Sequence, residues 1–419
     1  MKIAMVSEHA SPLAVIGGVD SGGQNVHVAA LSTALARAGH EVTVYTRRDD
    51  AGLPVRVTMS SGVTVEHLDA GPPSPIPKDD IFPHVGEMAA RLKAAWLDSQ
   101  PDVVHAHFWM SGLAALEAGR PLGIPVVQTF HALGTVKRRH QGIKDTSPPE
   151  RIPSEAAISR RVSRIVATCT DELFELSRLG ADPARISVVP CGVDTSLFSP
   201  TDGVADSRVA DRADAQPGTS GGDPFPYRLV TVGRLVERKG IDDAIRALAE
   251  IPAAQLVVAG GPDSHELNSD PDARRLLDLA QGLGVEDRVR LVGRLRRDQV
   301  PRLLRAADLA ICVPWYEPFG IVPLEAMSCA VPVVGAAVGG ISDTVVDGVT
   351  GVHVPPRHPA RLARAVRKLL AEPERRAAMG SAGRTRVVQR YQWSQVADGT
   401  LDAYEAACAT RPAYRVALG

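Results

Sequence analysis

The sequence LAICVPWYEPFGIVPLE at residues 309–325 predicts a strand, a turn and a helix in succession. Its apolar start is typical of a buried strand, and its last third is typical of a helix. The turn between them carries Glu317 and Gly320, and Glu325 follows on the helix. Residues at the carboxyl ends of strands in open α/β sheets line the ligand crevice, so we expect both glutamates to face it.

The same alternation of strand and helix extends outward in both directions from this stretch. Short β-branched runs are separated by Ala-, Leu- and Arg-rich stretches, which predicts parallel sheets with helices on both faces. Strands are expected at 2–7, 41–46, 103–107, 125–130, 165–169 and 186–189, and again at 228–232, 255–259, 289–292, 309–313 and 331–335. Expected helices include 26–38, 155–162, 242–250, 273–283, 300–306 and 359–371.

The chain is expected to form two domains, because 419 residues exceed one ordinary domain. The fold class is α/β, with two Rossmann-like doubly wound parallel-sheet domains facing across a cleft. We place the first at 1–200 and the second at 226–392. Residues 201–225, rich in Asp, Gly, Ser and Pro, are expected to form a flexible linker. The last helix, 393–419, is expected to pack back on the first domain.

Composition excludes several classes of partner. The 47 Lys and Arg residues balance 48 Asp and Glu residues, which argues against binding nucleic acid or an anionic membrane. No apolar run approaches the roughly 18 residues that span a bilayer, and the N-terminal MKIAMVS reads as a first strand. Five scattered cysteines without a CxxC pair favour reduced core cysteines in a soluble, cytoplasmic protein.

Two further turns are candidates for binding phosphate. The sequence DSGGQN at 20–25 follows the first strand, and Gly22 and Gly23 let the backbone approach a ligand at a helix start. The sequence GRLVERKG at 233–240 follows the first strand of the second domain, and Arg234 and Lys239 suit a diphosphate. An ordinary glycine turn and a solvated basic turn are the alternatives, and Arg238 is expected to be solvated.

The two glutamates of the opening stretch suit sugar hydroxyls. Glu325 lies among Leu324, Ala326 and Met327, so ionising it is costly unless a ligand donates hydrogen bonds, as ribose hydroxyls do. Gly320 lets main-chain N–H groups reach other hydroxyls. The alternative is a pair of ordinary helix-start glutamates.

Six motifs together resemble family 4 of the retaining glycosyltransferases, which have the GT-B fold. They are GGQN, FHALG, VVPCGVDTSLF, GRLVERKG, EPFGIVPLE and VPVVGAAVGG, in this order. Their order makes the resemblance specific, and it covers nearly the whole chain except 201–224. Within the family the chain is most similar to the branch of sucrose-phosphate synthase and mycothiol glycosyltransferase.

The resemblance implies a donor site on the second domain and an acceptor site on the first. Gly22 and Gly23 would approach the donor phosphates, Arg234 and Lys239 would neutralise the diphosphate, and Glu325 would hold the ribose. Glu317 and the backbone of Phe319, Gly320 and Ile321 would hold the donor sugar, and Arg294 would lie beside the base. His131 would lie beside the reacting sugar; with Glu317, Arg234 and Lys239 it forms the expected catalytic set.

The resemblance also implies the kind of reaction. A hexose-type sugar would pass to a small polar acceptor with retained configuration, without a covalent nucleophile, metal or cofactor, and the leaving phosphate would help to deprotonate the acceptor. The nearest branch favours a UDP-sugar over GDP- or ADP-sugars. A homo-oligomer is one possible assembly of the chain.

The acceptor side departs from the mycothiol branch, where a Lys, a Tyr, a Thr and an Arg surround an acceptor phosphate. The candidates for binding the acceptor in this chain are Asn25, Lys78, Phe108 and Arg151. Phe108, however, stands in place of the Tyr, and Ala132 stands in place of the Thr. Our hypothesis is that Lys78 and Arg151 contact an acidic group of the acceptor.

Other functions remain open from the sequence. A nucleotide-sugar 2-epimerase and a non-catalytic nucleotide-sugar-binding protein fit a bilobal fold, while a pyridoxal-phosphate phosphorylase needs a lysine that we cannot place. The Asp270–Asp272 DxD is expected to serve the start of a helix, with Asp272 as cap or first-turn residue. His105 and His107 lie on one strand face but lack a complete set of zinc ligands.

Overall fold

The computed structural model describes residues 1–14, 22–200 and 225–409 and divides the chain into two compact units. The first unit comprises Met1–Cys191 and Trp393–Gly419, and the second comprises Gly192–Gln392. The first unit thus ends at Cys191 rather than at residue 200, because Val193 and Phe198 are buried in a core of the second. The expected linker lies outside the described residues except for Phe225.

The described part of the first unit contains an eight-stranded sheet in the order β3-β4-β2-β1-β5-β6-β7-β8. Its pairs are parallel except for β3 with β4. The strands are β1 Lys2–Val6, β2 Glu41–Arg47, β3 Arg56–Thr58, β4 Thr64–Leu68, β5 Val103–His107, β6 Val126–Thr129, β7 Arg164–Ala167 and β8 Ile186–Val188. The β3–β4 pair was not predicted, because β3 is short and largely exposed.

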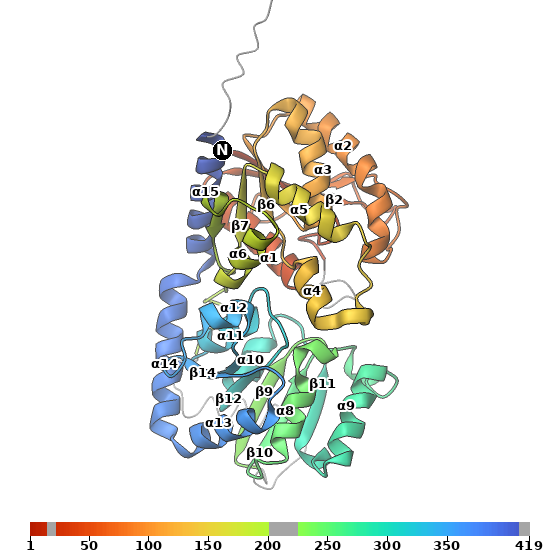
Figure 1. Cartoon of the computed structure of the whole chain (residues 1–419). Coiled ribbons are helices and arrows are strands. Elements are labelled where there is room, and N and C mark those ends of the chain that lie inside the picture. Colours follow the sequence, from red (N-terminus) through yellow and green to blue (C-terminus); the bar gives the residue numbers. More distant parts are fainter. Residues whose placement is uncertain (15–21, 201–224, 410–419) are drawn as a thin grey trace, which may run out of the picture. The chain divides into compact units, whose positions relative to one another are not determined.

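Helices cover both faces of this sheet (Figure 1). They are α1 Gly23–Arg37, α2 Val85–Asp98, α3 Trp109–Gly119, α4 Gly134–Gln141, α5 Arg151–Arg161, α6 Thr170–Arg178 and α15 Trp393–Ala409. One core lies between the sheet and α2, α3 and α5. The other lies between the sheet and α1 and α15, and it buries Val396 and Tyr404 of α15 with Ile3 and Met5 of β1.

The second unit has a parallel six-stranded sheet in its described part, in the order β11-β10-β9-β12-β13-β14. Its strands are β9 Tyr227–Val232, β10 Ala254–Ala259, β11 Val289–Gly293, β12 Leu309–Cys312, β13 Val333–Ala336 and β14 Gly351–Val354. Its helices are α8 Ile241–Leu248, α9 Pro271–Gly282, α10 Val300–Arg305, α11 Ile321–Ser328, α12 Gly339–Thr344, α13 Pro359–Ala371 and α14 Pro373–Arg390. Strand β10 is buried along its whole length, as expected of a parallel strand covered on both faces.

Each sheet contains a topological switch point, where the chain leaves its first strand in one direction and later returns to the other side. In the first unit this point lies between β1 and β5, and in the second between β9 and β12. Ligands of open α/β sheets bind at the carboxyl ends of strands at such a point. The loops that follow these four strands are therefore where a site is to be sought.

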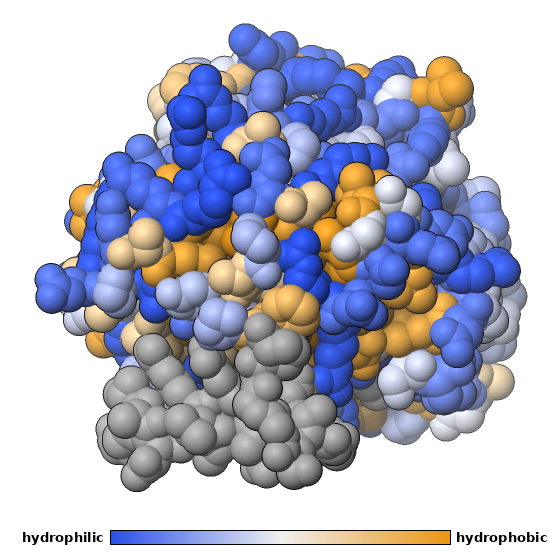
Figure 2. Space-filling view, turned by 90° about the horizontal axis from the view of Figure 1, so that it is seen from below, coloured by the Kyte–Doolittle hydropathy of each residue, from blue (hydrophilic) through white to orange (hydrophobic). Residues whose placement is uncertain are grey.

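On the face drawn in Figure 2, hydrophobic residues lie among polar ones. Figure 2 shows a largely hydrophilic face with separate hydrophobic areas. Within the described ranges, no helix is both long and apolar enough to cross a membrane. All five cysteines are free, and four of them are buried.

Candidate functional site

Two loops meet at the switch point of the second unit. The loop after β9 carries Lys239, and the loop after β12 carries Glu317. Lys239 Nζ donates to Glu317 Oε2 at 2.6 Å, so the ion pair joins the carboxyl ends of the two strands. Their side chains are 21% and 14% exposed, which leaves both within reach of a ligand. Sequence reasoning placed both residues at strand ends but did not predict that they pair.

The charge state of Glu317 follows from this contact. Burial acts to raise the pKa of Glu317, but the Lys239 cation and its hydrogen bond outweigh burial, and the pKa lies below its ordinary value. Arg238 also lowers it. The guanidinium of Arg238 lies 5.4 Å from the centre of the Tyr316 ring, so this residue is half-buried rather than solvated as expected.

Glu325 lies on α11 and is 2% exposed. Burial raises the pKa of its carboxyl, although the ion pair with Arg297 opposes the shift. Arg297 comes from the loop between β11 and α10, and its guanidinium also lies 4.6 Å from the centre of the Phe198 ring. No local sequence pattern indicates that Arg297 is the partner of Glu325, because Arg297 belongs to another loop.

Close backbone packing holds the loop between Glu317 and α11. Gly320 has φ +71° and precedes Ile321, the first residue of the helix. The N–H of Gly340 donates to the carbonyl of Glu317 at 2.8 Å. A Cβ on Gly339 would lie 2.2 Å from the same carbonyl, so only glycine fits there. Phe319, between these turns, is buried.

A small cavity of about 20 Å³ lies beside these residues. Its lining includes Gly233, Lys239, Cys312, Glu317, Pro323 and Ile341. Burial raises the pKa of the Cys312 thiol to about 12; Lys239 opposes this rise, and Glu317 and Glu325 add to it. These three charged groups therefore lie within electrostatic range of one buried atom.

The two arginines of the predicted donor site, Arg234 and Arg294, are exposed. Arg234 lies two residues after the end of β9. The N–H of Arg294 donates to the Pro262 carbonyl at 2.9 Å, and its Nε lies 3.7 Å from Asp263 Oδ1. Their predicted contacts with a diphosphate and a base stay predictions.

The glycine turn of the first unit forms the start of α1. Gly22 is exposed and extended, and Gly23 is the first helical residue. The Gly22 N–H donates to Asn25 Oδ1, and Asn25 Nδ2 donates to the Ser11 carbonyl, both at 3.1 Å. Asn25 therefore fixes the turn through both ends of its amide. Asp20 and Ser21 lie outside the described residues.

His131 lies two residues after the end of β6 in an unusual backbone conformation, with φ +63°. Its ring is buried and stacks on His107, with ring centres 5.1 Å apart. His107 Nδ1 and His131 Nε2 lie 2.9 Å apart and share a hydrogen bond. The His27 ring packs edge-on against His131 at 5.2 Å. Burial and the neighbouring imidazoles hold the pKa of His131 and that of His107 well below the usual range.

The hydrogen-bond partners of the neighbouring His105 define which of its ring nitrogens carries the proton. Thr129 Oγ1 donates to the Val166 carbonyl at 3.1 Å, so it accepts from His105 Nε2 at 2.9 Å. Burial lowers the pKa of His105 to about 3, and a neutral ring protonated at Nε2 accepts at Nδ1. The Tyr404 hydroxyl of α15 therefore donates to His105 Nδ1 at 2.7 Å.

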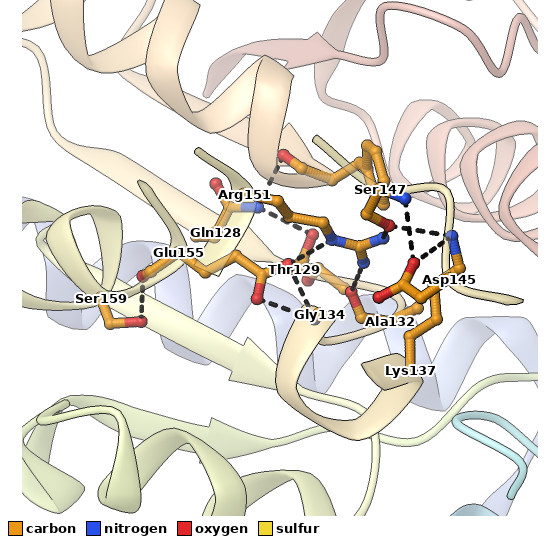
Figure 3. A network of polar contacts seen from close by, with 11 residues as sticks. Gln128, Thr129, Ala132, Gly134, Lys137, Asp145, Ser147, Arg151, Glu155 and Ser159 are labelled. Atoms are coloured by element: carbon orange, nitrogen blue, oxygen red, sulfur yellow. Dashed lines mark hydrogen bonds and ion pairs between the residues drawn. The ribbon is translucent and has the colours of Figure 1, made fainter. Parts of the chain in front are cut away.

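The predicted acceptor residues gather around the Phe108 ring. Phe108 follows β5, is buried, and has φ +80°. Lys78 Nζ lies 5.2 Å and Arg151 Cζ 5.0 Å from its ring centre. The structure thus brings three of the four candidates together, with Arg151 in a buried ion pair with Glu155 (Figure 3).

Sequence reasoning missed a carboxylate at the switch point of the first unit. Glu8 follows β1, is 1% exposed, and accepts hydrogen bonds from Ser111 Oγ and at 2.7 Å from His9 Nδ1. The His9 ring lies edge-on to Phe108 at 5.0 Å. The rule that ligands lie beyond the strand ends would have singled out Glu8 and His9.

The motifs considered for metal binding have other partners. Asp270 caps α9 by accepting from the Ala273 N–H at 2.8 Å, and Asp272 lies in the first turn, as expected. In the described part of the chain no group of three or more His, Cys, Asp or Glu side chains is arranged to hold a metal ion.

Comparisons with known proteins match both units. Residues 21–197 match the family described as Glycosyltransferase Family 4, and residues 218–386 match Glycosyl transferases group 1. The chain is 37% identical to a D-inositol 3-phosphate glycosyltransferase of Kineococcus radiotolerans, over 99% of this chain and 97% of that protein. It is 38% identical to D-inositol 3-phosphate glycosyltransferase 1 of Catenulispora acidiphila, over 97% and 96%.

Solved structures agree in fold. Sucrose-phosphate synthase from Thermosynechococcus elongatus is 31% identical and has a TM-score of 0.87, over 97% of this chain and 99% of that one. The Anabaena protein HepE, solved in complex with UDP and glucose, has a TM-score of 0.76 at 20% identity, over 97% and 100%, and supports the fold alone.

Two parallel-sheet α/β units and these relatives define the class of the protein as a glycosyltransferase enzyme with the GT-B fold. Within that class the chain belongs to glycosyltransferase family 4.

Proposed function

We propose that the enzyme moves a hexose-type sugar from a nucleotide-diphosphate sugar to a small polar acceptor, with retained anomeric configuration and without a metal. The observation that carries the proposal is the Lys239–Glu317 pair at the β9/β12 switch point, beside the buried Glu325. A cation there suits a pyrophosphate, and two carboxylates suit the hydroxyls of the two sugars that flank it. UDP is the favoured nucleotide, with GDP and ADP as alternatives.

The proposed mechanism rests on charge and position. Lys239, together with Arg234 on the same loop, would neutralise charge on the departing diphosphate, a role that many sugar transferases give to a metal ion. Glu317 and the backbone at Gly320 would orient the donor sugar, while Glu325 grips the ribose. The leaving phosphate would take the acceptor proton on the face where it departs, so that the new bond forms on that face.

The resting ion pair supports this assignment of roles. Lys239 is held by Glu317 before any donor arrives, so little side-chain entropy remains to be lost when it meets a phosphate. Glu325 is likewise held by Arg297 in the described structure. Ribose hydroxyls would replace or join Arg297 as donors to the Glu325 carboxylate.

The proposed acceptor follows from the names of the relatives and from two side chains that differ in this chain. The names of the curated relatives point to an inositol phosphate, and that of the solved structure points to a sugar phosphate as product. Phe108 and Ala132 supply no hydroxyl donors at the two positions where the related branch has Tyr and Thr. We therefore propose a small polyol or sugar acceptor, phosphorylated or not.

The test begins with the donor. Thermal-shift measurements with UDP, GDP and ADP identify the base, and NMR then follows UDP-glucose and UDP-N-acetylglucosamine with inositol and with D-inositol 3-phosphate, each with and without EDTA. A product with the donor's α configuration, formed at equal rates with EDTA, is expected. An inverted product, or loss of activity with EDTA, would refute the mechanism. An epimerised donor without acceptor would identify an epimerase, and binding without hydrolysis or transfer would identify a binding protein.

A further inference from the structure

The turn that carries His131 is held through its backbone by two side chains of α5 (Figure 3). Arg151 Nη2 donates to the Ala132 carbonyl at 2.6 Å. The Glu155 carboxylate accepts from the Gly134 N–H at 2.8 and 3.1 Å. Arg151 and Glu155 therefore fix the peptide groups on both sides of Leu133, which lies two residues after His131.

This bracing matters because the backbone of His131 is strained. A φ of +63° places a residue with a Cβ in the left-handed region, which costs roughly 1–2 kcal/mol. Such a conformation persists only where the surroundings determine it, and it is common at functional sites. The fit on this side is tight, since a Cβ on Gly134 would lie 3.0 Å from Ile152 Cγ1 and 3.2 Å from Arg151 Cδ.

Arg151 is engaged on every edge of its guanidinium. Its Nε donates to Glu155 Oε1 at 2.8 Å and its Nη1 to Ser147 Oγ at 3.1 Å, in addition to the Ala132 bond. The side chains of Arg151 and Glu155 are 2% and 0% exposed. The face of the Arg151 guanidinium lies over the Phe108 ring. An acidic acceptor would have to compete with a buried carboxylate for this cation, at a large cost in desolvation.

We propose that Arg151 and Glu155 are positioning residues for His131, and that Arg151 is not the cation that binds an acidic acceptor. The inference rests on the proposed function, in which His131 lies beside the reacting donor sugar. Arg151 orients the turn through the Ala132 carbonyl, and Glu155 caps the first N–H of α4 while neutralising Arg151. The ring is then held by His107 and the turn by α5.

The two roles predict different kinetics. A residue that positions His131 affects the donor sugar, so its loss slows cleavage of the donor even when no acceptor is present. A residue that binds the acceptor leaves acceptor-free hydrolysis unchanged and raises only the KM for the acceptor. Acceptor-free hydrolysis separates the two roles without knowledge of the acceptor.

The experiment compares Glu155→Gln and the double variant Arg151→Met/Glu155→Gln, which leaves no unpaired buried charge. The rate of UDP release from UDP-glucose and UDP-N-acetylglucosamine without acceptor is expected to fall roughly ten- to a hundredfold in both. In a His131→Ala background the same changes should cause no further loss. Arg139→Met is the matched control, because Arg139 pins α4 to Glu175 on α6 at 2.8–2.9 Å without touching the turn, and its rate should stay at the wild-type value.

Wild-type hydrolysis in both variants, with an increase confined to the acceptor KM, would overturn the inference. Additive losses with His131→Ala would overturn it as well. If the wild-type enzyme neither hydrolyses a nucleotide sugar nor transfers its sugar to an acceptor, the proposed function fails. In that case, and also if it transfers without hydrolysing, the bracing is judged by the crystal structure of the double variant. A His131 that leaves the left-handed region is expected there, and an unchanged turn would refute the inference.

Discussion

Removing the Lys239 cation tests the donor site most directly. Lys239→Ala takes away the partner of Glu317 and the fixed positive charge at the carboxyl end of β9. Turnover is expected to fall on the order of a hundredfold, because loss of one preorganised contact to developing charge costs about 2–4 kcal/mol of barrier. At about 1.4 kcal/mol per tenfold in rate, this range corresponds to roughly 30- to 1,000-fold.

The fold should survive this change. A fully buried ion pair costs about 3–5 kcal/mol when one partner is removed, but Lys239 is 21% and Glu317 14% exposed, so water reaches the remaining carboxylate and the cost is smaller. The pKa of Glu317, now held down chiefly by Lys239 against burial, should rise toward or above its ordinary value. Part of the lost stability is therefore recovered at acidic pH by protonation.

Initial rates of UDP release at saturating donor measure the effect, with melting monitored by circular dichroism. Arg238→Ala is the matched control, because Arg238 lies on the same loop against Tyr316, and its turnover should stay within about threefold of wild type. Near wild-type turnover in folded Lys239→Ala would refute the assignment of this residue to the leaving group. An equal loss in both variants would show that the loop, rather than the Lys239 charge, is responsible.

Three further changes test separate parts of the molecule. Glu325→Gln should weaken UDP binding roughly ten- to a hundredfold by calorimetry, since hydrogen bonds to a charged group contribute about 1.5–3 kcal/mol, and an unchanged Kd would remove Glu325 from the nucleotide site. Burial lowers the pKa of His27 from about 6.5 to about 4, so the unfolded state binds the proton more readily than the folded state. The free energy of unfolding should therefore fall by up to about 3 kcal/mol as the pH drops through this interval. His27→Asn should flatten that dependence in urea titrations, and an equal slope would contradict it. Gly260→Ala would place a Cβ 1.9 Å from the Gly233 carbonyl and should prevent folding. Gly86→Ala in α2, where a Cβ would meet no atom within 4 Å, should raise the free energy of unfolding by up to about 1 kcal/mol. Similar stability of the two variants would refute the packing described.

The sheet strands were largely predictable because parallel strands covered on both faces are continuous apolar runs. Strands β9, β10 and β12 lie close to their expected positions for this reason. Strand β3 carries no such signal, since only three residues pair and two of them are exposed. Helix α5 begins at Arg151 rather than at Glu155, because Arg151 packs inward and Pro153 does not interrupt the first turn.

The candidate site was predictable where it depends on strand ends and not where it depends on pairing across loops. Lys239 and Glu317 lie in the loops that follow two apolar strands, β9 and β12, and were found from that position. Arg297, the partner of Glu325, lies in a polar stretch of arginines where no local pattern distinguishes one from another. Arg151 and Glu155 are spaced i, i+4 on one helix, a spacing that favours an ion pair and would have revealed their contact.

The second core of the first unit depends on a helix that is synthesised after the second unit. Helix α15 buries Val396 and Tyr404 against β1, yet the whole of Gly192–Gln392 separates it from Cys191. At roughly 5–20 residues per second, a ribosome needs about 10–40 s to add that interval. Throughout this time the nascent β1 sheet lacks the cover that α15 provides. Translation order therefore allows the second unit, although it is encoded later, to reach its finished fold before the first.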